Sequence, residues 1–348
     1  MSIPTIAFFN NKGGVGKTSL VFHVVSMLAD MGKRVVAADL DPQANLTASF
    51  LDEDKLEELW PENGHSSTIY GSLEPLIKAT GDIASPHVEI IDHRISLIAG
   101  DLALSSFEDQ LSEVWPKCLD RDERAFRVTS AFWRIMQDAA QKQSAEFILI
   151  DLGPNLGAIN RAALISSDCV VVPLGPDLYS LQGLKNLGPK LRQWRSGWQD
   201  RLGRNPIPNV PMPMGSIEPL GYVIMQHSVR LDRPVKSYER WISRIPATYR
   251  EAVLDEAPGT VTNVERDPYC LSLLKHYRSL MAIAQENRKP MFRLRAADGA
   301  IGAHQAAALD AGRDFRYLAE RILEGVSASQ HALATGTAAV KSGDEDLF

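Results

Sequence analysis

The feature that most constrains this chain is a glycine-rich segment between a short apolar run and an amphipathic run. The segment reads Asn10-Asn11-Lys12-Gly13-Gly14-Val15-Gly16-Lys17-Thr18. Ile3–Phe9 before it is almost entirely apolar, as expected of a strand buried on both faces. Lys17–Met31 after it carries apolar residues at spacings of three and four, which predicts a helix. A strand, a glycine loop and a helix in this order predict a phosphate-binding site, because backbone N–H groups and the positive end of a helix dipole converge there.

Each residue type in the loop has a chemical reason. Glycines let the backbone approach phosphate closely, Lys17 supplies charge to the β- and γ-phosphates, and Thr18 offers a hydroxyl to Mg²⁺. The loop departs from the usual G-x-x-x-x-G-K-[ST] pattern, because Asn11 holds the first glycine position. It matches the variant K-G-G-x-x-K-[ST], with a second lysine at Lys12. We therefore expect a nucleoside triphosphate to be bound by Lys12, Gly13, Gly14, Val15, Gly16, Lys17, Thr18 and Ser19.

Strand and helix patterns alternate along most of the chain. Further buried strands are expected at Arg34–Leu40, Phe147–Asp151, Cys169–Pro173 and Leu220–Met225. Further helices are expected at Ser67–Ala79, Leu102–Trp115, Arg124–Gln143, Ala158–Ser166, Leu178–Trp198, 235–250, 270–287 and 304–324. Two strands joined by one helix form a βαβ unit, which requires a parallel sheet. The pattern predicts an α/β protein with a doubly wound, mainly parallel sheet.

The 348 residues are expected to form one domain over 1–325. Residues 50–145 are interpreted as a helical insertion, although 88–100 contains strand-like alternation. Residues 204–219 are dense in proline and are interpreted as a second insertion without regular structure. The segment 326–348 is small and polar, which predicts a disordered tail.

At this point the sequence resembles the deviant-Walker P-loop ATPases of the ParA/MinD family, in the ParA-type branch. Besides the loop, the segment 39–47 (DLDPQANLT) is similar to the family motif D-x-D-P-Q-x-N-x-T. The segment 148–151 (ILID) is similar to its Walker B strand, and 170–184 is similar to the following strand and helix. The resemblance covers about 1–50 and 146–187, and it implies the P-loop NTPase fold with ATP and Mg²⁺ as ligands.

The resemblance also implies roles for individual residues. Lys17 would contact the phosphates of its own nucleotide, and Lys12 would reach the nucleotide of a partner chain in a homodimer. Asp41 would position the attacking water, which is sufficient chemistry for phosphoryl transfer to water. Thr18, Asp39 and Asp151 would serve Mg²⁺. The alternative for Asp39 and Asp41 is helix capping and turn formation.

The charge is unevenly distributed. Residues 180–321 hold 22 Lys and Arg against 14 Asp and Glu, whereas residues 1–179 hold 14 against 25. A basic block within an acidic protein suggests a polyanionic partner, and arginines that simply coat helix faces are the alternative. The expected contacts to non-specific DNA are Arg192, Arg195, Arg230, Arg233, Lys236, Arg240, Arg244, Lys275 and Arg278.

The resulting functional hypothesis is a ParA-like ATPase for DNA partition or cargo positioning. It would form a nucleotide-sandwich dimer, bind DNA, hydrolyse ATP slowly and respond to a ParB-like or other adaptor, in the cytoplasm on the nucleoid. An alternative is a ParA-like ATPase recruited to a mobile element, phage defence, or organelle or receptor placement. A MinD-like membrane-cycling ATPase is disfavoured, because the tail is not a basic amphipathic helix and no membrane partner is expected. Three scattered cysteines argue against an iron–sulfur carrier.

Overall fold

The computed structural model describes residues 2–61, 64–227, 236–259 and 263–335. One eight-stranded sheet runs through them in the order β3-β4-β2-β5-β1-β6-β7-β8. Its strands are β1 (Thr5–Phe8), β2 (Val35–Asp39), β3 (Glu89–Ile90), β4 (Ile95–Ile98), β5 (Phe147–Asp151), β6 (Cys169–Leu174), β7 (Glu218–His227) and β8 (Cys270–Lys275). All pairings are parallel except that of β3 with β4. The predicted class, a doubly wound and mainly parallel α/β sheet, is confirmed.

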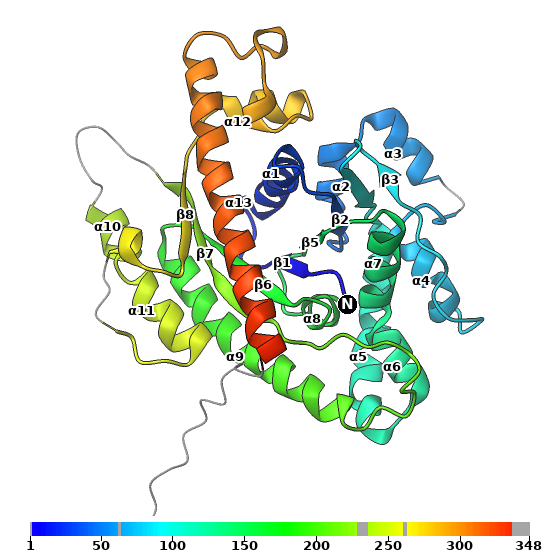
Figure 1. Cartoon of the computed structure of the whole chain (residues 1–348). Helices are drawn as coiled ribbons and strands as arrows, with labels where there is room; N and C mark the ends of the chain where they lie inside the picture. Colours follow the sequence, from blue (N-terminus) through cyan, green and yellow to red (C-terminus); the bar gives the residue numbers. More distant parts are fainter. Residues whose placement is uncertain (1, 62–63, 228–235, 260–262, 336–348) are drawn as a thin grey trace, which may run out of the picture.

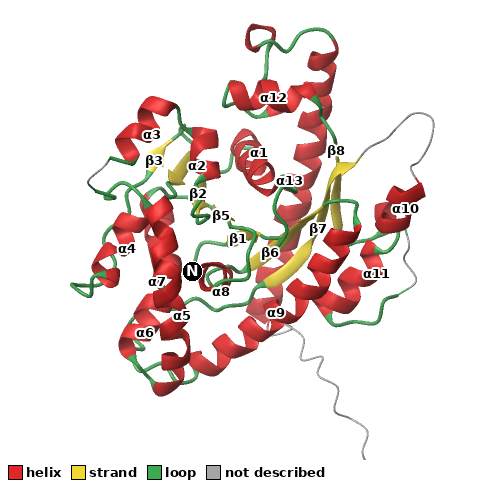
Figure 2. Ribbon diagram, turned by 180° about the vertical axis from the view of Figure 1, so that it is seen from behind, coloured by secondary structure: helices red, strands yellow, loops and turns green. Residues whose placement is uncertain are grey.

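Helices cover both faces of the sheet, and each face has its own apolar core (Figure 1). One core is shared with α1 (Lys17–Asp30), α2 (Asn45–Phe50), α3 (Glu53–Leu59), α12 (Ser279–Glu286) and α13 (Ala303–Thr335). The other is shared with α4 (Ile69–Ile77), α5 (Phe107–Lys117), α6 (Glu123–Thr129), α7 (Ala131–Lys142), α8 (Ala158–Ile165), α9 (Leu178–Leu202), α10 (Lys236–Ile242) and α11 (Ile245–Tyr249). Figure 2 shows the long helix α9 beside α11. Of the helices that the structure describes, none has the length and apolarity needed to span a bilayer.

The register of the central strands places the important carboxylates at one edge of the sheet. Phe8 of β1 and Asp39 of β2 both align with Asp151 of β5. Because parallel strands all end on the same side, the glycine loop after β1 lies at that edge too. The strand order therefore brings together the three segments that carry the family-like motifs.

The helical insertion expected at 50–145 is more closely integrated than the sequence suggests. The segment does contain helices α3 to α7, but it also contributes β4, which pairs with β2 inside the sheet. Ile95, Leu97 and Ile98 of this strand are fully or almost fully buried. The strand-like alternation noted at 88–100 thus corresponds to β3 and β4, because the edge of β2 offers backbone hydrogen bonds that the alternating segment can complete.

Two expectations for the C-terminal part were wrong. The first six residues of the helix expected at 270–287 form β8, which pairs with β7, and only Ser279–Glu286 is helical. The tail expected to be disordered from 326 begins as part of α13, which extends to Thr335. Val326 is buried against the sheet-facing core, and this burial favours continuation of the helix past Gly325. Residues 336–348 lie outside the described residues.

The close packing of α9 against residues 250–254 can be tested at Gly188. A Cβ at Gly188 in α9 would lie 1.8 Å from the backbone oxygen of Ala252, so Gly188→Ala must displace backbone. We expect a loss of about 3 kcal/mol in the free energy of unfolding, measured by urea denaturation. The control is Gly203→Ala at the end of the same helix, where the nearest atom is 3.7 Å away and φ is −62°. Equal stability of the two variants would contradict this packing.

Candidate functional site

The glycine loop connects β1 directly to the first turn of α1. Gly16 takes the N-cap position of α1 with φ at 86°, and no side chain caps the helix. Gly14 also has a left-handed φ, 73°, a conformation that an L-residue adopts with strain. The first N–H groups of α1 are consequently directed to the space above the loop, which suits an anion.

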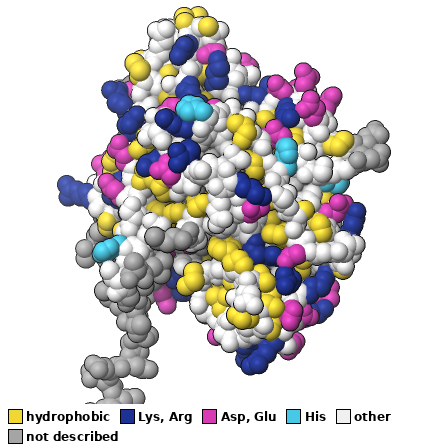
Figure 3. Space-filling view, turned by 45° about the vertical axis from the view of Figure 1, so that its right-hand side comes forward, with side chains coloured by type: hydrophobic (Ala, Val, Ile, Leu, Met, Phe, Trp, Pro, Cys, Tyr) yellow, Lys and Arg dark blue, Asp and Glu magenta, His cyan; other side chains and the backbone are white. Residues whose placement is uncertain are grey.

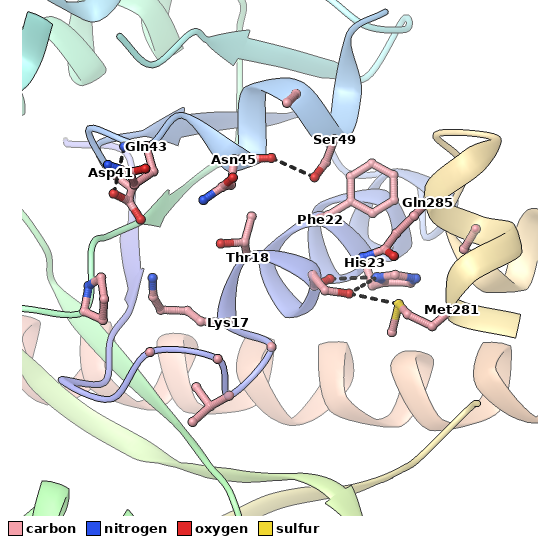
Figure 4. Close-up of a pocket in the computed structure, with 18 of the residues that line it drawn as sticks. Lys17, Thr18, Phe22, His23, Asp41, Gln43, Asn45, Ser49, Met281 and Gln285 are labelled. Atoms are coloured by element: carbon pink, nitrogen blue, oxygen red, sulfur yellow. Dashed lines mark hydrogen bonds between the residues drawn. The ribbon is translucent and has the colours of Figure 1, made fainter. Parts of the chain in front are cut away.

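A cavity of about 610 Å³ lies above this loop (Figure 4). All eight residues predicted to bind the nucleotide line it, from Lys12 through Ser19, and Asp41 lines it as well. In Figure 4 the side chains of Lys17 and Asp41 point toward one another across one end of the cavity. The structure therefore brings the phosphate loop and the predicted water-positioning carboxylate to a single space.

Lys17 forms a buried ion pair with Asp151 at the end of β5. The Lys17 Nζ lies 3.2 Å from Asp151 Oδ1, and Asp151 is fully buried. Burial raises the pKa of Asp151, while the charge of Lys17 acts in the opposite direction. Besides Lys17, the hydroxyl of Thr18 is close enough to lower the pKa of Asp151, but neither carboxylate oxygen has a donor with regular hydrogen-bond geometry among the described residues. A buried carboxylate in this condition is costly, so the donor set fits a cation and its water shell.

Asp41, unlike Asp151, lines the cavity. It is buried, its Oδ1 accepts a hydrogen bond from the Gln43 N–H at 3.0 Å, and it lines the cavity. Its carboxylate is thus fixed by a turn and presented to the cavity at the same time. The turn-forming alternative and the catalytic one are therefore compatible for this residue.

Asp39 is hydrogen-bonded to Thr47, a residue of its own motif. Its Oδ2 accepts hydrogen bonds from both the N–H and the hydroxyl of Thr47, each at 2.8 Å. Burial and the neighbouring Asp151 raise the pKa of Asp39 to about 7. Like Asp151, Asp39 does not line the cavity, but it differs from Asp151 in having its carboxylate occupied by Thr47. These contacts favour the alternative interpretation, in which Asp39 fixes the start of α2.

Sequence reasoning missed the wall of the cavity that faces α1. Met281, Ala284 and Gln285 of α12, together with Arg288, line the cavity. A second cavity of about 310 Å³ adjoins Gly16 and is lined by residues 274–278, which form the end of β8 and the start of its connection to α12. No sequence signal points to this wall, because 270–275 has no clear period and the whole of 270–287 is interpreted as one helix.

His23 joins the phosphate-loop helix to this C-terminal wall. Its Nδ1 is 2.7 Å from the Ser19 carbonyl oxygen, and its Nε2 accepts a hydrogen bond from the Met291 N–H at 3.1 Å. Its ring stacks on Phe315 of α13. The acceptor role of Nε2 places the proton of the neutral ring on Nδ1.

The predicted DNA contacts have different environments. Arg192 donates to the Ala252 carbonyl oxygen and Arg195 to that of Ile217, so both hold the chain together. Lys275 lies near Asp310 and Asp314. Figure 3 shows basic and acidic side chains interspersed over one face.

The remaining candidate DNA contacts include exposed arginines. Arg240 and Arg244 are exposed, with their guanidinium groups 4.9 and 5.5 Å from the centre of the Trp241 ring, and Arg278 is exposed beside the second cavity. Lys236 begins α10, while Arg230 and Arg233 lie outside the described residues. The nine residues are thus not equivalent: among those whose side chains the structure describes, Arg240, Arg244 and Arg278 are exposed, whereas Arg192 and Arg195 donate to backbone carbonyls.

Comparisons with known proteins agree with this geometry. A family model described as an AAA domain matches residues 3–202, more than half of the chain. The chain is 31% identical over 183 residues to the sporulation initiation inhibitor protein Soj of Bacillus subtilis, which covers 52% of this chain and 62% of Soj. The match thus spans less than two thirds of that relative.

Solved structures show the same fold. A plasmid partition protein from Borrelia burgdorferi bound to AMPPNP covers 93% of this chain and 99% of its own, with 17% identity and a TM-score of 0.54. McdA from Cyanothece, in complex with ATP, covers 92% and 96%, with 16% identity and a TM-score of 0.60.

The neutral state of His23 generates a pH prediction. Burial lowers the pKa of His23 to about 4, below the value near 6.5 expected in the unfolded chain. The unfolded chain therefore binds more protons between pH 6.5 and 4, and stability falls as pH falls through this range. The loss amounts to about 3 kcal/mol. Urea denaturation at several pH values should show a smaller loss for His23→Gln, and parallel curves for the two proteins would contradict it.

Because the family model spans more than half of the chain and the glycine loop has the variant sequence described above, this chain belongs to the ParA/MinD family of P-loop ATPases.

Proposed function

We propose that this chain binds ATP in the 610 Å³ cavity and hydrolyses it slowly, as part of a cycle that partitions DNA or positions cargo. The observation that carries the proposal is the convergence of the whole glycine loop, Lys17 and Asp41 on one cavity, with Asp151 held against Lys17. Positioning and charge neutralisation are the main requirements of phosphoryl transfer, and these residues supply both.

Different residues would bind the phosphates, the metal ion and the attacking water. The N–H groups of the loop and Lys17 would hold the triphosphate, while Thr18 and Asp151 would hold Mg²⁺, which supplies neutralisation of phosphate charge when bound. Asp41 would orient the attacking water. Asp39 would act indirectly, by fixing α2 through Thr47.

The second cavity is the proposed place for the adenine ring. It adjoins Gly16 and Ser19, as the base end of a nucleotide bound to the loop requires, and it is mainly apolar. Met225, Leu274 and Met281 provide surfaces on which a flat ring can pack.

Assembly and DNA binding are the further parts of the proposal. Lys12 at the start of the loop would serve the phosphates of a second copy, so that ATP is enclosed between two chains. The exposed Arg240, Arg244 and Arg278 would contribute non-specific phosphate contacts. A ParB-like or other adaptor would stimulate hydrolysis and release the DNA. The names of two relatives, chromosome-partitioning ATPase Soj of Thermus thermophilus and chromosome partitioning protein ParA of Myxococcus xanthus, support this direction.

Removing the phosphate lysine tests nucleotide binding. Lys17→Ala should weaken ATP–Mg²⁺ binding by at least about 100-fold, since it removes the cation from the loop and leaves Asp151 buried without its partner. The measurement is displacement of a fluorescent ATP analogue. The matched control is Lys33→Ala, whose partner Glu146 is half-exposed and outside the cavity residues. Wild-type affinity in Lys17→Ala would refute the assignment of the loop.

Removing the water-positioning carboxylate tests the cycle. Asp41→Ala should bind ATP but hydrolyse it at least about 100-fold more slowly, so that ATP-bound dimers accumulate and retain duplex DNA. Gel filtration and a DNA retention assay with ATP and Mg²⁺ measure both effects. DNA retention should fall steeply with salt. Exclusively monomeric protein with ATP, or retention that ignores salt and nucleotide, would argue against the proposal.

A further inference from the structure

Lys12 is engaged within its own chain. Its Nζ lies 2.5 Å from Oδ2 of Asp177 and 5.7 Å from the centre of the Tyr179 ring. The Lys12 side chain is 30% exposed and that of Asp177 is 38% exposed, so the ion pair lies at the surface and its contribution is modest. A surface ion pair of this kind holds a side chain in place and breaks readily when a stronger anion is offered.

Asp177 also determines where α9 begins. Its Oδ1 accepts a hydrogen bond from the Ser180 N–H at 2.9 Å, which caps the helix, while its Oδ2 faces Lys12. Partial burial acts to raise the pKa of Asp177, but the hydrogen bonds from Lys12 and Ser180 hold it below its ordinary value. One carboxylate thus links the phosphate loop to the first turn of α9.

Other contacts join the loop to the same helix. Asn10 donates from Nδ2 to the Pro173 carbonyl oxygen at 2.6 Å, ahead of α9. A Cβ at Gly183 would lie 2.9 Å from Oδ1 of Asn11, so α9 approaches the loop closely. Beside Asp177, Leu178 and Tyr179 are 50% and 73% exposed. An apolar surface of this kind next to Lys12 is suited to being covered by a second copy of the chain.

We propose that Asp177 is a positioning residue that keeps Lys12 within its own chain before assembly and releases it when two chains enclose nucleotide. This inference rests on the proposed function. The Lys12 Nζ lies 2.5 Å from Asp177, so the carboxylate competes with phosphate for the same ammonium group. Assembly would therefore exchange two ion pairs, one in each chain, for contacts to phosphate.

The test is Asp177→Asn, because asparagine caps helices as well as aspartate but carries no charge. With AMPPNP and Mg²⁺ at low salt, the variant should dimerise about fivefold more tightly than wild type in sedimentation equilibrium, since neither chain has an ion pair to break. Asp177→Ser, which also caps, should behave in the same way. Lys12 should in addition react faster with an amine-acylating reagent in the nucleotide-free variant.

Salt separates this role from a purely structural one. The difference in dimer affinity should vanish at high salt, because screening weakens the ion pair of the wild-type chain. If the variant dimerises as tightly as wild type or less tightly, or if the difference ignores salt, the inference is wrong and the proposed function stands. If wild type itself fails to assemble with nucleotide, the proposed function is wrong, and the inference with it.

Discussion

The ion pair between Lys17 and Asp151 is the interaction on which the rest of the site depends. It joins the first residue of α1 to the last residue of β5, and both side chains are buried. Two such charges are tolerated in a core only when they neutralise each other or a ligand. The parallel register brings β1, β2 and β5 to a common edge, so this pair, the glycine loop and Asp41 meet at one place.

The C-terminal third of the chain completes this site from the other side. The edge strand β8 directs residues 274–278 past Gly16, and α12 then forms a wall of the cavity. His23 connects α1 to this wall through Met291 and to α13 through Phe315. The phosphate loop is therefore supported by the last described helix as well as by the first, although nearly 300 residues separate them in sequence.

The sequence predicted the fold and the loop because both depend on local signals. Buried parallel strands are short apolar runs, and the loop needs glycines and lysines in a fixed order between a strand and a helix. The strand β8 was missed because CLSLLK has no clear period, and its state is decided by the open edge of β7. For Asp39 the resemblance implies a role at Mg²⁺, and the fold adds a hydrogen bond from Thr47, the last residue of the same motif, that the pattern alone does not reveal.

The distribution of charge in the sequence predicted binding residues less well than the sequence motifs did. The surplus of arginine in residues 180–321 does not reveal which side chains are free, since Arg192 and Arg195 satisfy backbone carbonyls across the fold. The pairing of Lys12 is likewise not visible in the sequence, because a lysine expected to act on another chain forms an ion pair with Asp177 of its own chain. Such pairings depend on segments that are distant in sequence and become visible only when the chain is folded.

The most direct measurement of the central claim is a calorimetric titration of the full chain with AMPPNP in the presence of Mg²⁺. The structure predicts one binding site per chain, with affinity that falls when Mg²⁺ is removed by a chelator, because Asp151 and the phosphates then lose their shared cation. A titration without heat at millimolar nucleotide, confirmed by the absence of any displacement of a fluorescent analogue, would contradict the account.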